Sequence, residues 1–385
     1  MSTLLNSIKR GCRTLVSRPV YLCMMVLVPL GVFFFFLDLM DAGLPLKAPT
    51  AVVDADHSSL SRQVTRSLES SELLDINQKL ESYHEGIEKV RSGEIFGFFY
   101  IPADFERDAI AGVKPTLSYY SNMTYFVPGT LSFKGFKTTA VTVTGGIVVT
   151  TLASAGYDGD PMTIIQPLVA QDHPIGNPWL NYAYYLNNSF VPGVIALLVM
   201  MITVFSITEE MKRGTSVEWL QTSGGSMLVA LVGKLLPQTV VFTVLGWTLQ
   251  SLMYYWLNYP LNCPLGHMLL AMFLMVVACQ AFALTICELV PNLRIALSIV
   301  SLVGILSFSI TGFSFPVQSM YGAVGIFSYI IPLRYYFLIY VDQALNGIPL
   351  YFSRFYYVAL LVFLLVPFIG LRKLRNHCLN PVYIK

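Results

Sequence analysis

The chain reads TEEMKRGTSVEWL at residues 208–220, where five charged side chains directly follow the apolar run Ser189–Thr208. The simplest interpretation is a set of solvated charges at the end of a membrane span, since charge runs usually form a solvated face. The spacing also allows a short helix, a bend at Gly214, which can adopt left-handed conformations, and a second short helix that begins near Thr215. The stretch therefore predicts an elbow that could dock on a soluble partner.

The composition indicates a membrane protein. Of 385 residues, 55% are hydrophobic and only 12% are charged, whereas soluble globular proteins carry about 25% charged residues. The six cysteines lack a Cys-x-x-Cys spacing and the five histidines are scattered, so neither a metal site nor a disulfide framework is predicted. The chain also lacks the G-x-x-x-x-G-K-[ST] phosphate loop. We therefore expect no catalytic residue, no metal and no bound nucleotide in this chain.

Six apolar runs are long enough to cross a bilayer, because a helix rising 1.5 Å per residue needs about 20 residues for a ~30 Å hydrocarbon core. The runs are Val20–Leu37, Ser189–Thr208, Leu235–Trp256, His267–Cys287, Ile295–Phe313 and Phe355–Leu371. The first defines a span at 20–40, and the other five define a transmembrane domain at 187–376.

The basic residues set the expected orientation, because lysine and arginine concentrate in cytoplasmic loops. With the N-terminus inside, the cytoplasmic set is Lys9, Arg10, Arg13, Arg18, Lys212, Arg213, Lys234, Arg294, Arg372, Lys373 and Arg375. The loop 257–266 carries no basic residue and falls outside. Both termini, including the tail 377–385, are therefore predicted to be cytoplasmic.

Residues 1–19 fit a basic amphipathic helix lying in the membrane interface. The expected apolar face holds Leu4, Leu5, Ile8, Cys12, Leu15 and Val16. A cleaved signal peptide is the alternative. The following apolar run is long for such a peptide, and no A-x-A-like cleavage site follows it.

Residues 41–186 have the character of a soluble domain, because charges concentrate there and the apolar runs shorten to strand length. The expected strands and helices alternate: strand Thr50–Asp54, helix Ser58–Ser70, an apolar piece at 73–76, helix Gly86–Arg91, strand Glu94–Ile101, helix Asp104–Ala111 and strand Thr116–Tyr120. Such alternation predicts a small α/β domain on the outer side. Tyr125–Ala155 resembles a longer helix. The Asp54-Ala55-Asp56 turn could hold a cation, but a turn or capping role is the stronger prediction.

The segment 315–345 is apolar enough to suggest a seventh span. Arg334 would then lie inside the hydrocarbon, at a cost of roughly 2.5–3.5 kcal/mol at the bilayer centre, next to the helix-interrupting Pro332. A seventh span would also place the basic C-terminal residues outside. We therefore predict a re-entrant helical pair in the outer leaflet, where irregular backbone is covered by protein. Arg334 is expected to reach the headgroup region as a lone side chain, or to pair with Asp342.

Several of these residues resemble motifs of ABC-2 type exporter permeases. Glu209-Glu210, Gly214-Thr215 and Glu218 look like the Glu-x-x-x-Gly-Thr element after the second span, which in that family faces the cytoplasmic ATPase subunit. The segment 311–320 resembles the GxxFPxxxMP element, 331–336 resembles PLTYF, and 342–347 resembles the turn that follows. Tyr321 and Arg334 depart from the family, which often has proline and threonine there. The order of elements resembles the subgroup with a large domain between spans one and two.

The resemblance implies a fold, a function and partners. The fold is an α-helical polytopic membrane protein with six transmembrane helices and an inserted extracytoplasmic α/β domain. The function is that of a permease subunit of an ATP-driven ABC exporter in a bacterial inner membrane. Two permease copies, or this chain and a homologous permease, would form the path, and separate ATP-binding subunits would hold ATP and Mg²⁺. A periplasmic adaptor and membrane lipids are further partners in that family, and no nucleic acid is expected.

The resemblance also assigns residues. The cytoplasmic coupling loop 209–226 would contact the ATPase through Glu209, Glu210, Arg213, Gly214, Thr215 and Glu218. For the re-entrant segment, which is predicted from the residues themselves, the expected site residues are Gly312, Pro316, Pro332 and Arg334, of which Arg334 departs from the family.

Two other classes of protein fit parts of the sequence. A membrane-anchored sensor or envelope scaffold would act through its ectodomain, but it needs only one or two spans. A secondary transporter is disfavoured because the chain lacks two similar halves.

Overall fold

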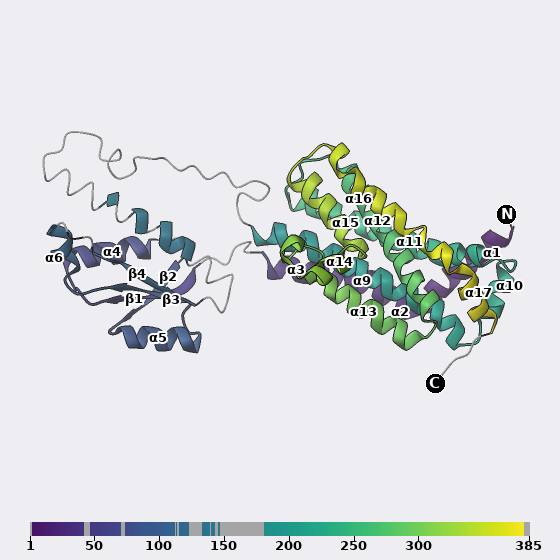
Figure 1. Ribbon diagram of the computed structural model, residues 1–385, viewed down its shortest axis with the longest axis horizontal. Coiled ribbons are helices and arrows are strands. Elements are labelled where there is room, and N and C mark those ends of the chain that lie inside the picture. Colours follow the sequence, from purple (N-terminus) through teal and green to yellow (C-terminus); the bar gives the residue numbers. More distant parts are fainter. Residues whose placement is uncertain are drawn as a thin grey trace. The chain divides into compact units, whose positions relative to one another are not determined.

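The computed structural model describes residues 2–41, 47–70, 74–111, 113, 115–122, 133–138, 140–142, 145–146 and 181–380. The chain divides into two compact units (Figure 1). One unit comprises Met1–Gly43 and Pro174–Lys385 and is helical; the other comprises Leu44–His173 and contains the sheet. An α/β unit is therefore inserted in a helical protein, as the sequence predicts.

The helical unit contains six helices that are long and apolar enough to cross a membrane, counted over the described residues. The first span is built from α2 (Pro19–Leu22), a π-helical turn (Cys23–Leu27) and α3 (Val28–Leu39). The others are α9 (Tyr182–Lys212), α11 (Met227–Ser251) with a π-helical turn (Leu252–Trp256), α12 (Leu265–Leu289), α13 (Leu293–Ile310), and α16 (Leu350–Phe363) with a 3₁₀ turn (Val366–Ile369). The six predicted spans are confirmed.

Two spans begin about two turns before their apolar runs. The side chain of Asn181 caps α9 by accepting a hydrogen bond from the Ala183 amide at 2.8 Å, which satisfies a donor that the helix start leaves unpaired. Asn187 and Asn188 consequently lie inside α9 and are buried. Helix α11 starts at Met227, so Lys234 lies within it rather than at its start.

The core of the helical unit forms around α9 and α12. Their most apolar windows are 72% and 61% buried, against 17% for the last span, whose side chains remain free to face lipid. Small residues let α9 approach α13 closely, as is common between membrane helices. A Cβ atom on Gly193 would overlap the Phe308 ring, and one on Gly304 would overlap Leu197.

The segment before the last span is a bent helical pair. Helix α14 (Gly322–Ser328) and helix α15 (Pro332–Ile339), which continues in a π-helical turn (Tyr340–Leu345), meet at an angle of 80°. At the far end of the pair, Asn262 in the loop between α11 and α12 donates to the Leu345 carbonyl at 2.7 Å. Before the pair, Phe313 accepts a hydrogen bond from Tyr185 near the start of α9. Both ends of the segment therefore lie at the end of the bundle where α9 begins, as a re-entrant pair requires.

We expect labelling of single cysteines to place this segment. On a cysteine-free background, cysteines at Ser319 and Asn346, both exposed, should react in intact cells with a membrane-impermeant thiol reagent. A cysteine at Asn376 should react only after permeabilisation, because an odd number of crossings separates it from the other two. Labelling of Ser319 without Asn346 in intact cells would mean that the segment spans.

Over the residues that the structure describes, the inserted unit contains a four-stranded sheet with the order β2-β1-β3-β4. Strands β1 (Ala48–Asp54), β2 (Leu74–Leu80) and β3 (Gly97–Ile101) run parallel, and β4 (Ser118–Ser121) pairs antiparallel with β3. Helices α4 (Ser59–Glu69) and α6 (Phe105–Ile110) follow β1 and β3, and α5 (Tyr83–Ser92) follows β2. The predicted α/β fold is confirmed, and most of the helix expected at 125–155 lies outside the described residues.

Alternation along the strands builds two small cores, because successive side chains point to opposite faces of a sheet. Val52 and Phe99 pack with α4 and α6 on one face. Ala51, Val53 and Phe98 pack with α5 on the other. The two faces are visible in Figure 1 as helices above and below the sheet.

The Asp54–Asp56 turn has the predicted turn and capping role. Asp54 accepts from the Asp56 amide at 3.1 Å, and Asp56 caps α6 by accepting from the Phe105 amide at 2.9 Å and the Glu106 amide at 3.1 Å. Burial raises the pKa of Asp56, whereas its hydrogen bonds, including one with Ser58, lower the pKa by more than burial raises it. The net pKa therefore lies below the ordinary value.

Candidate functional site

Three short helices meet at one end of the helical unit: α1 (Ser2–Ser17), α10 (Ser216–Thr222) and α17 (Leu371–Leu379) (Figure 1). We call this end the α10 end. Ser216 at the start of α10 donates to the Cys378 carbonyl of α17 at 2.7 Å. Burial raises the pKa of the Cys378 thiol to about 12, so this cysteine is an inert packing residue. The contact fixes α10 against the C-terminal helix.

Glu210 is the centre of a buried charge cluster at this end. Lys234 of α11 places its Nζ 2.5 Å from Glu210 Oε1 and also donates to the Ser206 carbonyl at 3.0 Å. Arg10 of α1 lies 3.2 Å from Glu210 Oε2, and the Thr215 hydroxyl donates to the same oxygen. Glu210 and Lys234 are 8% and 6% exposed. A buried pair is tolerated only when such additional hydrogen bonds satisfy it.

Glu209 extends the cluster toward the first span. Its carboxylate pairs with Arg18, which precedes α2, and with Arg213 at 2.7 Å. Lys234 also lies over the ring of the buried Trp219, 4.5 Å from its centre, where the ring face attracts a cation. We define the charge cluster as Arg10, Arg18, Glu209, Glu210, Arg213 and Lys234.

The predicted elbow has the expected backbone. Gly214 has a φ of +72°, a conformation that glycine adopts without steric cost, and it separates α9 from α10. Thr215 occupies the position before α10, but its hydroxyl binds Glu210 instead of capping the helix.

The interpretation of the stretch as solvated charges is wrong for both glutamates. Glu209 and Glu210 are buried because partners from α1, α11 and the chain before α2 converge on them. Lys212, Arg213, Gly214 and Glu218 remain exposed.

Helix α1 packs on α11 through its small residues rather than through the apolar face predicted from the sequence. Ser7 and Gly11 lie against Gly233 of α11 so closely that a Cβ atom on Gly11 would overlap the Gly233 carbonyl, and one on Gly233 would overlap Ser7. Part of the expected apolar face is turned outward, with Leu5 65% and Val16 89% exposed, whereas Leu15 is half-buried against the core. The spacing of the small residues Ser7 and Gly11 was the available signal, since small residues mark close helix contacts.

The residues predicted for the re-entrant segment lie together. Arg334 is 5% exposed, donates to the Thr311 carbonyl at 2.9 Å and lies over the Tyr329 ring at 4.7 Å. Gly312, with a φ of +97°, allows this approach, because a Cβ atom there would lie 3.1 Å from Arg334 Nη1. Pro316 precedes a 3₁₀ turn (Val317–Ser319), and Pro332 is the first residue of α15, where a missing amide hydrogen is harmless.

Both expectations for Arg334 are wrong. It does not pair with Asp342, which accepts a hydrogen bond from Ser353 at 3.1 Å, and it is too buried to be a lone side chain reaching water. The bend between α14 and α15 instead brings Tyr329 and Thr311 to the guanidinium. Within the part of the chain that the structure describes, no three His, Cys, Asp or Glu side chains gather as metal ligands would.

Comparison with protein-family models matches the chain over residues 19–371 to the model described as ABC-2 family transporter protein. The chain belongs to this family. A search of curated proteins found no match. The ABC-2 family match makes the protein a multi-pass membrane component of an ABC transporter, with its six spans inside the matched range. The match includes Glu209, Glu210 and Lys234 of the charge cluster, and α1 precedes it.

Proposed function

We propose that this ABC-2 protein is the permease subunit of an ATP-driven exporter. Two permease subunits form the translocation path, and separate ATP-binding subunits dock at the α10 end, which faces the cytoplasm of a bacterial cell. The charge cluster is the observation that carries this proposal, because it links α10 to α9, to α11 and to the start of the first span.

The contacts that join α1, α11 and the elbow to α9 meet at Glu210. Through one carboxylate it holds Lys234 of α11, Arg10 of α1 and Thr215 of the elbow. Glu209 adds Arg18 at the start of the first span. The elbow and α10 are joined to the cluster by the Thr215 hydroxyl on Glu210 and by the Trp219 ring against Lys234. Within the cluster, buried ion pairs hold α9, α11 and α1 together, and breaking such a pair costs about 3–5 kcal/mol. Moving these helices together is the cheaper response, so the cluster can transmit a push on α10 to the spans.

The surface available for docking surrounds the two buried glutamates and shares only Arg213 with the charge cluster. Its exposed residues are Lys212, Arg213, Gly214, Glu218, Gln221, Gly224 and Gly225. The Glu218 side chain is 71% exposed and lies 3.8 Å from Arg10, so a contact at Glu218 reaches the cluster directly. The buried glutamates act through this surface and do not touch the ATP-binding subunit themselves.

Cross-linking tests the docking surface. On a cysteine-free background, cysteines at Glu218 and Gln221 should form bismaleimide adducts with an ABC ATP-binding subunit, identified by its phosphate-loop peptides in mass spectrometry. A cysteine at Asn346, exposed at the opposite end of the helical unit, is the matched control and should give none. Adducts from Asn346 alone, or none from either α10 position, would contradict the proposed docking surface.

A further inference from the structure

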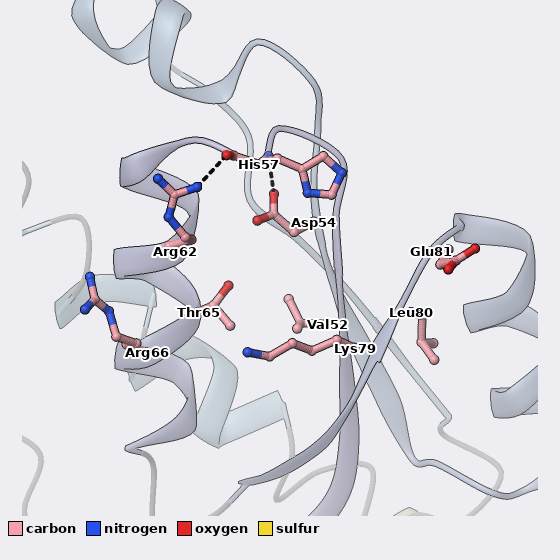
Figure 2. A pocket seen from close by; sticks show the side chains of 9 residues that line it. All are labelled: Val52, Asp54, His57, Arg62, Thr65, Arg66, Lys79, Leu80 and Glu81. Atoms are coloured by element: carbon pink, nitrogen blue, oxygen red, sulfur yellow. Dashed lines mark hydrogen bonds between the residues drawn. The ribbon is translucent and has the colours of Figure 1, made fainter.

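The α/β unit contains a pocket that the proposed transport function does not use. It has a volume of about 730 Å³, within the range of roughly 300–1,000 Å³ that small-molecule sites occupy. Its lining comes from β1, the following turn, α4 and the end of β2: Val52, Asp54, His57, Arg62, Thr65, Arg66, Lys79, Leu80 and Glu81 (Figure 2).

The pocket lies at the carboxyl ends of the parallel strands β1 and β2, where parallel sheets commonly bind ligands. Asp54 and Leu80 are the last residues of the neighbouring parallel strands β1 and β2. The chain leaves β1 toward α4 on one face of the sheet and leaves β2 toward α5 on the other. Because these connections diverge, they leave a crevice outside the carboxyl ends of the strands, which is the usual ligand site of open parallel sheets.

The charges around the pocket favour an anion. Arg62 and Arg66 extend from α4, and Lys79 reaches from β2 toward α4 (Figure 2). Arg66 has no ion pair among the residues described. Arg62 donates to the His57 carbonyl at 2.7 Å through one nitrogen, which orients the guanidinium and leaves its other donors available. Lys79 is 3.1 Å from Glu69, which does not line the pocket.

Two acidic residues, Asp54 and Glu81, line the pocket beside the three basic ones, and Glu81 lies apart from the basic side chains (Figure 2). Asp54 already accepts hydrogen bonds from the His57 amide at 3.0 Å and from the Ser61 hydroxyl at 2.7 Å. His57 adopts a φ of +52°, which non-glycine residues rarely do. Such strained positions cluster at binding sites, and this one holds the imidazole at the edge of the pocket.

We propose that this pocket binds a phosphate group, with Arg62, Arg66 and Lys79 as its cationic ligands. Arginine matches phosphate oxygens with its planar fork, and lysine adds a point charge. The phosphate can belong to a soluble phosphate compound or to a phospholipid headgroup. The inference goes beyond the proposed function and does not depend on it.

Equilibrium dialysis of the full chain in dodecyl maltoside, which contains no phosphate, tests the site. The ligands are radiolabelled inorganic phosphate and glycerophosphoglycerol, a soluble phosphodiester headgroup. Saturable binding of inorganic phosphate alone assigns the site to soluble phosphate compounds, and binding of glycerophosphoglycerol assigns it to lipid headgroups. If neither ligand binds saturably below about 10 mM, the proposal is overturned.

The variant Arg66→Gln/Lys79→Gln should raise the dissociation constant about tenfold or more, because two charge-assisted contacts are removed. Both side chains are exposed, so folding should be retained. Arg91→Gln, an exposed arginine of the same unit outside the pocket lining, should bind as the unchanged protein does. Equal binding by the double variant would also overturn the assignment.

Discussion

Glu210→Leu is expected to lower the free energy of unfolding by roughly 3–5 kcal/mol, the usual effect of removing one partner of a buried ion pair. The substitution leaves Lys234 buried without its carboxylate and removes the acceptor of Thr215 and Arg10. Unfolding is measured by titration with sodium dodecyl sulfate in mixed micelles. Fluorescence of Trp219, with the chain's other three tryptophans replaced by phenylalanine in every variant, is the readout, because the Trp219 ring is buried against Lys234.

The double variant Glu210→Leu/Lys234→Met should recover part of this loss, because it removes the unpaired charge together with its partner. Glu218→Gln is the matched control. The Glu218 side chain is 71% exposed, so its loss should change stability by no more than about 1 kcal/mol. If Glu210→Leu were as stable as Glu218→Gln, Glu210 would not be the buried centre of the cluster.

Gly233→Leu is expected to detach α1 from α11. The two helices touch at Ser7, Gly11 and Gly233 with no room for a side chain, so a leucine must push α1 away. Displacement of α1 separates Arg10 from Glu210. Trypsin should then cleave after Arg10 and Arg13 about tenfold faster or more, since cleavage follows the population of the open form.

Two further variants make this result specific. Gly11→Leu should accelerate cleavage in the same way, because it introduces the same overlap from the other helix. Gly31→Leu in α3 should leave cleavage unchanged, because a Cβ atom on Gly31 would meet no atom of the described residues within 4 Å. Unchanged cleavage in both Gly233→Leu and Gly11→Leu would show that α1 does not depend on this contact. If the proposed function holds, Gly233→Leu also loses transport.

Local sequence patterns were sufficient to predict the membrane spans, the strands of the α/β unit and the bend at Gly214. The apolar length of about 20 residues identifies each span because the bilayer core has a fixed thickness, so the run Val20–Leu37 predicts the span Pro19–Leu39. Short alternating runs identify the strands of the α/β unit for an equally local reason, the two-residue period of the strand. The bend at Gly214 follows from glycine alone.

The environment of the charges could not be predicted in this way. From its neighbours in the sequence, Glu210 is predicted to be solvated. In the fold it is buried, because its partners Arg10 and Lys234 come from 200 and 24 positions away. Arg334 likewise finds Thr311 and Tyr329 only through the bend between α14 and α15.

The sequence by itself therefore determined the six spans, the inserted α/β unit and the glycine elbow, each of which depends on a short window of residues. Only the tertiary structure decided that Glu209 and Glu210 are buried, that α1 packs through Ser7 and Gly11, and that Arg334 lies over Tyr329. The reason is physical. Hydrophobic length and backbone preference belong to neighbouring residues, whereas burial of a charge depends on which distant segments supply its partners and exclude water.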